Sequence, residues 1–303
     1  MTNTRSATWT TIGTAINTQD VQEALRLSGL DYTVQLDEVY RNFGGKQIQV
    51  PEKKAIVRSN DGHLYNVLSD KYTPIQNVDA FDFLNSIDDD ITFVKAGETN
   101  SGLIYIIGHV KKVSILGDDF DVFAIFQNGH NGRFQLSMTM CPLRLVCENQ
   151  FNIAFKESES TFKIRHTKNI ESKVQIATET LQSIADYMKV FEAHAEQYAG
   201  MKLSETQITK FINFMFPEKE TMTPALLNRL EDQKNAFYKA YNANDNGNFK
   251  GTVWGLINGL TDYITHKPFM RKVEDIAEKK FMDTILFSND LNNGIKFLTE
   301  IAA

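Results

Sequence analysis

The chain has 303 residues, of which 42% are hydrophobic and 23% are charged, a composition that is ordinary for a globular protein. Its formal net charge of −6 argues against a protein that coats duplex DNA by bulk positive charge, although a local basic groove is compatible with it. No apolar run approaches about 18 residues, the chain starts without a hydrophobic signal, and its two cysteines are typical of a reducing compartment. We therefore expect a protein of the cytoplasm without membrane-spanning segments.

Residues 1–19 are rich in threonine, serine and asparagine, and we expect them to form a polar N-terminal arm. Asp20 is a suitable N-cap for a short helix over residues 21–27, and Gly29 would end that helix. Alternating apolar residues then predict strands that are joined by turns and followed by a helix. These elements are strands over 32–36, 54–58 and 64–68, turns at Gly44-Gly45 and Asn60-Asp61-Gly62, and a helix over 78–87.

Between residues 91 and 140 the pattern is that of β-strands throughout. The expected strands cover 92–95, 103–107, 110–116, 121–126 and 133–140. Their short, glycine-containing connections predict an antiparallel meander. The continuous apolar runs at 103–107 and 123–126 further predict that both faces of the middle of the sheet are covered.

The segment 127–155 joins the predicted sheet to the predicted helices. Its turn-rich start predicts a tight hairpin whose structural residues are Asn128, Gly129, His130 and Gly132. Cys141-Pro142 is expected to end the next strand, and apolar spacing predicts a helix over 143–155. Arg133 and Arg144 would stand at the two junctions. The segment is therefore either a structural hairpin that leads into a core helix or a place where basic side chains serve a chemical role.

A basic segment follows a polar loop over residues 156–160, and residues 162–169 are expected to form a short strand or an extended arm. Between residues 163 and 173 there are four lysine or arginine residues and one glutamate, a net charge of +3 in an acidic protein. The basic residues are Lys163, Arg165, Lys168 and Lys173. This edge is either a solvated charged surface or a site that contacts an anion such as phosphate.

The chain beyond residue 170 has the pattern of helices. Apolar residues spaced by three or four predict one long helix over 170–198. Ser204 and Gln207 form a capping box for a helix over 205–216, and further helices are expected over 224–243, 270–286 and 291–301. Glycines four residues apart, at Gly251, Gly255 and Gly259, predict a helix face that another element approaches closely. A phosphate-binding glycine loop is the alternative, but the lysine and the preceding strand of such a loop are missing.

These patterns predict an α+β fold. An antiparallel β-meander core packed by helices would occupy residues 20–169, and a helical region over 170–303 would pack on that core or extend from it. The six histidines are scattered and there is no Cys-x-x-Cys pair, so no metal site is expected. His130 beside Arg133 resembles an acid–base pair, but no nucleophile is marked by the sequence. We expect neither a cofactor nor an enzymatic activity.

Several segments resemble a prokaryotic phage/plasmid-like family with a domain of unknown function, domain of unknown function 932. The matching segments are 24–34, 58–62, 67–77, 81–84, 129–132, 144–149, 165–169, 251–255 and 261–266. The resemblance implies a mobile genetic element in the cytoplasm of a bacterial host, and no defined activity. Asn131 stands where the family pattern has an acidic residue, and Gln150 stands where it has threonine. Both differences argue against a catalytic role for these positions.

Two hypotheses for the function follow from different classes. A β-meander followed by a helix, with basic residues at the junction, is similar in architecture to phage single-strand annealing proteins of the RecT and Erf types. In the first hypothesis the protein is a homo-oligomer that binds single-stranded DNA, with Phe134 or Phe162 stacking on bases. The residues expected to contact phosphates are Arg133, Arg144, Lys156, Lys163, Arg165, His166 and Lys168. In the second, the protein is a structural or host-interaction protein that acts through the helix 170–198 and the glycine face 251–259.

Overall fold

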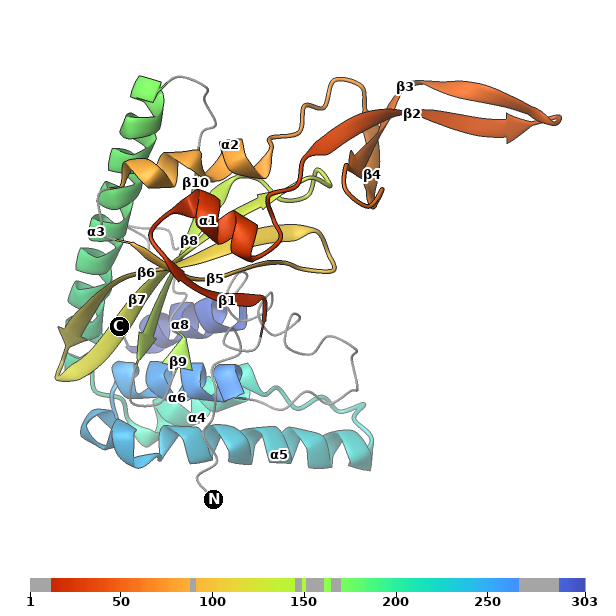
Figure 1. The fold of residues 1–303 in the computed structure, drawn as a ribbon. Helices are drawn as coiled ribbons and strands as arrows, with labels where there is room; N and C mark the ends of the chain where they lie inside the picture. The colour runs from red at the N-terminus through yellow and green to blue at the C-terminus, as the bar shows by residue number, and fades with distance from the viewer. Residues whose placement is uncertain are drawn as a thin grey trace.

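A computed structural model describes residues 12–87, 91–144, 149–150, 161–164, 170–266 and 289–302. It contains a large antiparallel sheet, a small antiparallel sheet and a group of helices that forms the C-terminal part of the chain (Figure 1). The expected α+β class is therefore confirmed. Among the described helices, none is long and apolar enough to cross a membrane.

The large sheet is a meander, as the sequence predicted, but the separately predicted strands 103–107 and 110–116 form one continuous strand. Its strands follow the order β1-β5-β6-β7-β8-β10, and β9 pairs with β8 beside β10. The strands are β1 (Thr14–Thr18), β5 (Thr92–Glu98), β6 (Leu103–Ile115), β7 (Asp118–Gly129), β8 (Ser137–Arg144), β9 (Asn149–Gln150) and β10 (Thr161–Lys163). The central pair, β6 and β7, is joined by Leu116 and Gly117, which both have positive φ (54° and 83°). Such a two-residue turn matches the twist of the strands that it connects.

Both faces of the middle of the sheet are buried, which confirms the expectation from its apolar runs. Ile104 and Ile106 of β6 belong to the main hydrophobic core, together with helices α1 (Val21–Leu27), α2 (Asn77–Phe81) and α3 (Ile170–Gly200). Their neighbours Leu103, Tyr105 and Ile107 face the other way and form a second core with residues of β7 and β8. The alternation follows from the two-residue period of a strand.

The C-terminal helices begin and end close to the predicted positions. They are α3, α4 (Glu205–Met215), α5 (Pro224–Tyr241), α6 (Val253–His266) and α8 (Asn289–Ala302), and the predicted helix 270–286 lies outside the described residues. Ser204 and Gln207 form the predicted capping box at the start of α4. Phe191 of α3 contacts Phe120 of β7 and Trp254 of α6, with ring centroids 5.7 and 6.0 Å apart, so the helices pack on the sheet.

The glycines of the helical region play two different roles. A Cβ atom on Gly255 would lie 2.0 Å from the carbonyl oxygen of Phe249, and one on Gly259 would lie 2.9 Å from the Cα atom of Tyr241 in α5. The predicted close approach is confirmed at both positions. Gly251 does not share this face, because it precedes α6 and has a φ of 74°. It is needed for a turn and not for helix packing.

The predicted helix over 143–155 is wrong in its described part. Strand β8 continues through Cys141 and Pro142 to Arg144, and β9 follows at residues 149–150. Pro142 is opposite Val122 of β7, while β10 pairs only up to Thr139 and β9 only from Leu143. A proline is compatible with a strand where the missing N–H faces no partner. The tight hairpin at 128–132 is also wrong, because β7 ends at Gly129 and β8 begins at Ser137.

The N-terminal region forms more strand than the sequence predicted. Residues 14–18, expected in a polar arm, form β1 at the edge of the large sheet and pair with β5. The helix expected over 78–87 is divided into α2 and a 3₁₀ helix, η2 (Asp82–Ser86). The small sheet consists of β2 (Val34–Phe43), β3 (Lys46–Arg58) and β4 (Leu64–Ser69), in that order. Its strands β2 and β3 are much longer than expected and project from the body as a two-stranded ribbon (Figure 1).

Candidate functional site

The structure places two of the seven predicted phosphate-contacting side chains. Arg133 and Lys163 are both exposed. The backbone of Arg144 ends β8, opposite Phe120 of β7. The other four candidates, Lys156, Arg165, His166 and Lys168, lie outside the described residues.

Arg133 and Lys163 lie at the same end of the large sheet. Lys163 is the last residue of β10 and is paired with Ser137, the first residue of β8. Arg133 lies four positions before Ser137 in the connection 130–136, where its backbone N–H donates to the side-chain oxygen of Asn131 at 2.9 Å. The local structure therefore brings two cations to the end of the sheet where β8 begins.

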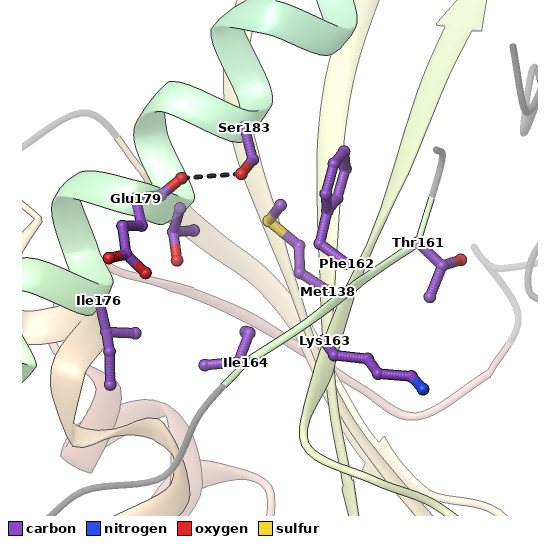
Figure 2. A pocket seen from close by; sticks show the side chains of 9 residues that line it. Met138, Thr161, Phe162, Lys163, Ile164, Ile176, Glu179 and Ser183 are labelled. Carbon is purple, nitrogen blue, oxygen red and sulfur yellow. Dashed lines mark hydrogen bonds between the residues drawn. The ribbon is translucent and has the colours of Figure 1, made fainter. Parts of the chain in front are cut away.

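A pocket of about 800 Å³ lies beside Lys163, between β10 and α3 (Figure 2). Phe162 and Met138 lie on its β side, whereas the Lys163 side chain points away from α3, as the alternation along a strand requires. The full lining consists of Met138, Thr161, Phe162, Lys163, Ile164, Ile176, Glu179, Thr180 and Ser183. The site thus combines apolar side chains, the hydroxyl groups of Thr180 and Ser183 and one carboxylate, while the side chains of Thr161 and Lys163 point away from α3 at its margin.

The predicted turn residues Asn128 and His130 are buried and belong to a polar cluster. Asn77, at the start of α2, is the centre of this cluster. Its side-chain nitrogen donates to the carbonyl oxygen of Leu30 at 2.9 Å, so its Oδ1 atom is the acceptor that faces His130 Nε2 at 3.0 Å and Asn128 Nδ2 at 3.3 Å. His130 Nε2 must therefore carry the proton. The hydrogen-bond partner of His130 is Asn77 and not Arg133, so the geometry gives no support to the acid–base pair that their spacing resembles.

The other ring nitrogen of His130, Nδ1, is buried and has no hydrogen-bond partner in the described part of the chain. The ring is fully buried, and this burial lowers the pKa of His130 to about 4. A charged imidazole would be costly here, because no carboxylate accepts a hydrogen bond from either ring nitrogen within the described ranges. His130 is therefore neutral at physiological pH and serves as a donor to Asn77.

Two tyrosines extend the cluster toward the small sheet. The ring centroids of Tyr32 and Tyr65 lie 6.2 and 5.4 Å from that of His130. The Tyr65 hydroxyl donates to the Tyr32 hydroxyl at 2.7 Å, and the Tyr32 hydroxyl donates to Glu98 Oε2 at 2.9 Å. Burial raises the pKa of Tyr32 to about 12, and burial also raises the pKa of Tyr65. Both hydroxyls therefore stay protonated and act as donors.

Arg58 of β3 completes the cluster. Its Nη1 atom lies 3.0 Å from Glu98 Oε2, and its Nε and Nη2 atoms bind the two oxygens of Asp61 at 2.9 and 2.8 Å. The guanidinium also lies over the rings of Tyr32 and Tyr65, 5.1 and 5.9 Å from their centroids. The hydrogen bonds that Arg58 donates to the Asp61 carboxylate raise the pKa of Arg58. These contacts join β3 and β4 of the small sheet to β5 of the large sheet.

Sequence reasoning missed most of this cluster. Asn77 and His130 are 53 positions apart, and Tyr32 and Glu98 are 66 positions apart, so no local spacing reveals their contacts. A weak signal exists in the segments 24–34, 58–62, 67–77 and 129–132, because each contributes at least one member. In the part of the chain that the structure describes, no group of three or more histidine, cysteine, aspartate or glutamate residues could hold a metal ion.

The profile of a protein family, DUF932, described as a domain of unknown function, matches residues 64–284. The chain belongs to this family. The DUF932 match includes Tyr65, Asn77, Glu98 and His130 of the polar cluster, whereas Tyr32 and Arg58 precede it. No match was found among curated proteins or among solved structures. Because the description of DUF932 names no activity, the function has to be inferred from the surfaces of the molecule.

Proposed function

We propose that this DUF932 protein is a non-enzymatic nucleic-acid-binding protein of a phage or plasmid, which holds single strands for annealing, replication or recombination in the cytoplasm of its bacterial host. The interface would run along the end of the large sheet formed by β10 and the connection 130–136. The observation that carries this proposal is the pair Phe162 and Lys163, in which an aromatic ring lines a pocket and the adjacent residue is an exposed cation.

Single-strand-binding proteins combine aromatic side chains, on which bases stack, with cations that contact the phosphates. The pocket beside Phe162, at about 800 Å³, lies within the size range of sites that hold small organic groups such as a base. Lys163, whose side chain points away from the pocket, and Arg133 would contact phosphates outside the pocket, where the nucleic-acid strand continues past that base. The overall charge of −6 means that attraction to nucleic acid has to come from such a local group of cations.

The test is fluorescence anisotropy with a labelled oligonucleotide of about 40 nucleotides, single-stranded and duplex, between about 50 and 200 mM salt. The change is the double substitution Arg133→Gln and Lys163→Gln. On single strands each phosphate contact contributes about 0.7 to the slope of log affinity against log salt, so we expect the variant's slope to be smaller by about 1.4. Lys210→Gln, which removes an exposed lysine on α4, is the matched control and should leave the slope unchanged.

A wild-type slope that survives the double substitution would refute the assigned interface. Absence of binding at micromolar protein would refute the function itself. The alternative would then be a structural or host-interaction protein that self-assembles or binds a host factor without DNA. That alternative was expected to act through the helix 170–198 and the glycine face 251–259. The glycine face is already covered within this chain, because Gly255 and Gly259 pack against Phe249 and Tyr241.

A further inference from the structure

The outer part of the β2–β3 ribbon is built as an independent two-stranded arm. Strand β4 pairs with β3 only between Lys53 and Val57, so residues 39–50, which we name the ribbon tip, have no third strand beside them in the described structure. Gly44 and Gly45 join the strands with φ values of 60° and 74°, the conformation of a two-residue hairpin turn. The turn fixes the pairing of Phe43 with Lys46.

The pairing sorts the side chains of the ribbon tip onto two different faces. Cross-strand partners share a face, and successive residues alternate. Arg41 is opposite Ile48 and Phe43 is opposite Lys46, so one face carries two cations and two apolar side chains. The other face carries Tyr40 with three amides, Asn42, Gln47 and Gln49. The guanidinium of Arg41 lies over the Phe43 ring, 5.6 Å from its centroid, which confirms that they share a face.

The aromatic residues of the ribbon tip are exposed although burial would stabilise them. Phe43 is 68% exposed and Tyr40 is 56% exposed. An isolated two-stranded ribbon is at best marginally stable in water, and an exposed phenylalanine at its end adds nothing to the core. These positions therefore indicate a contact with another molecule.

The charge of the ribbon tip indicates the class of that molecule. Residues 39–50 contain Arg41 and Lys46 and no aspartate or glutamate. Nearer the body, the Glu38 carboxylate is already bound by Lys54 and accepts a hydrogen bond from Gln49 at 2.6 Å. No carboxylate of the described residues forms an ion pair with either tip cation. Two exposed cations beside an exposed ring, without a carboxylate, match a ligand that has both anionic groups and flat aromatic groups.

We propose that the ribbon tip is a second contact for single-stranded nucleic acid, in which a base stacks on Phe43 while Arg41 and Lys46 bind the adjoining phosphates. This inference rests on the proposed function and adds a site that is separate from the sheet edge. An acidic protein surface would match the cations but gives no reason for the exposed ring. A lipid surface would match the ring and the cations, but the opposite face with its three amides would oppose insertion.

The experiment compares the full-length wild type with Phe43→Ala, Phe43→Trp and the double variant Arg41→Gln/Lys46→Gln in the anisotropy titration, with single-stranded DNA and RNA as probes. Loss of one stacked base should raise the Kd of Phe43→Ala by about 5- to 150-fold, whereas Phe43→Trp should bind like the wild type. The double variant should reduce the salt slope by about 1.4. Tyr238→Ala, which removes an aromatic side chain of α5 that is 41% exposed, is the matched control and should change neither quantity.

Tryptophan fluorescence gives a second readout that does not depend on affinity. The Phe43→Trp variant should show quenching by the single strand in excess of that shown by the wild type, which has two tryptophans of its own. One outcome refutes the inference and leaves the proposed function standing. In that outcome the wild type binds, Phe43→Ala binds equally tightly, and Phe43→Trp shows no quenching in excess of the wild type. If Phe43→Ala changes the oligomer mass at unaltered affinity, the ribbon tip is a contact between copies and the inference is also refuted. If the wild type binds neither probe at micromolar protein, the proposed function itself fails.

Discussion

The neutral, buried state of His130 predicts how the stability of the protein depends on pH. In the folded chain the ring donates from Nε2 to Asn77 and has a pKa of about 4. In the unfolded chain the pKa would be about 6.5. The unfolded state therefore binds a proton at a higher pH than the folded state does. The free energy of unfolding must fall as the pH decreases through 6.5 toward 4, and it is unaffected by this residue above about pH 7.

The magnitude follows from the two pKa values. In the unfolded chain the His130 ring takes up a proton at a pKa of about 6.5, whereas in the folded chain its pKa is about 4. Between about pH 7.5 and pH 4.5 this difference lowers the free energy of unfolding by about 2–3 kcal/mol. This loss is a sizeable fraction of the total stability of about 5–15 kcal/mol of a typical protein. Tyr32 and Tyr65 also face the ring, but their pKa values are raised by burial, so they do not titrate in this range.

The assay is urea unfolding of the wild type and of His130→Phe at several pH values between about 4.5 and 7.5. Phenylalanine keeps a ring between Tyr32 and Tyr65 but cannot be protonated, so its pH profile contains only the contributions of other groups. We expect the free energy of unfolding of the wild type to fall by about 2–3 kcal/mol more than that of the variant over this range. NMR titration of the His130 ring in the folded wild type gives the pKa directly, and it does not depend on whether the variant folds. Parallel pH profiles, or a ring that titrates near 6.5, would refute the described environment of His130.

Two further predictions concern single positions. In urea unfolding, Gly255→Ala should destabilise the protein by about 3 kcal/mol or more, because the added Cβ atom would lie 2.0 Å from the Phe249 carbonyl oxygen. Gly247→Ala is the control, because a Cβ atom at this position meets nothing within 4 Å. It should change the free energy of unfolding by less than about 0.5 kcal/mol. Equal effects would contradict the close approach of α6 to Phe249. Asp20→Ala should cost about 1 kcal/mol, because the carboxylate accepts hydrogen bonds from the backbone N–H groups of Gln22 and Glu23 at 2.7 and 3.0 Å, and Asp20→Asn should retain most of that stability. An unchanged melting temperature for Asp20→Ala would show that the cap does not stabilise α1.

Elements that are specified by local chemistry could be predicted from the sequence. The cap at Asp20, the capping box at Ser204 and the apolar spacing of α3 each involve neighbouring residues, and the structure has all three. The segment 143–155 shows the limit of such reasoning. Apolar residues at Cys141 and Leu143 alternate as in a strand, while the wider spacing of the segment also fits a helix. The pairing of β8 with β7, which spacing does not encode, decides in favour of the strand.

The ribbon and the polar cluster were harder to predict, for different physical reasons. The ribbon tip is exposed on both faces, and the alternation of apolar and polar residues that marks a half-buried strand is confined there to the short run 47–50. The polar cluster depends on contacts between distant segments, such as that of Asn77 with His130. Of the residues expected at the interface, Arg133 and Lys163 are exposed at one end of the sheet, and their contact with nucleic acid stays a prediction. The pocket beside Phe162 forms only when α3 packs next to β10, so sequence reasoning missed it.

The position of β1 has a consequence for the order in which the chain can fold. Thr14 of β1 lies opposite Ala96 of β5, so this pairing closes a long loop that contains α1, the small sheet and α2. Closing such a loop is entropically unfavourable until the other partners of β5 are in place. During synthesis from the N-terminus, β1 is made first but has no partner until β5 appears. We therefore infer that the first described strand of the chain is among the last to join the sheet, and that the hairpin of β6 and β7, which are consecutive in the chain, forms before it.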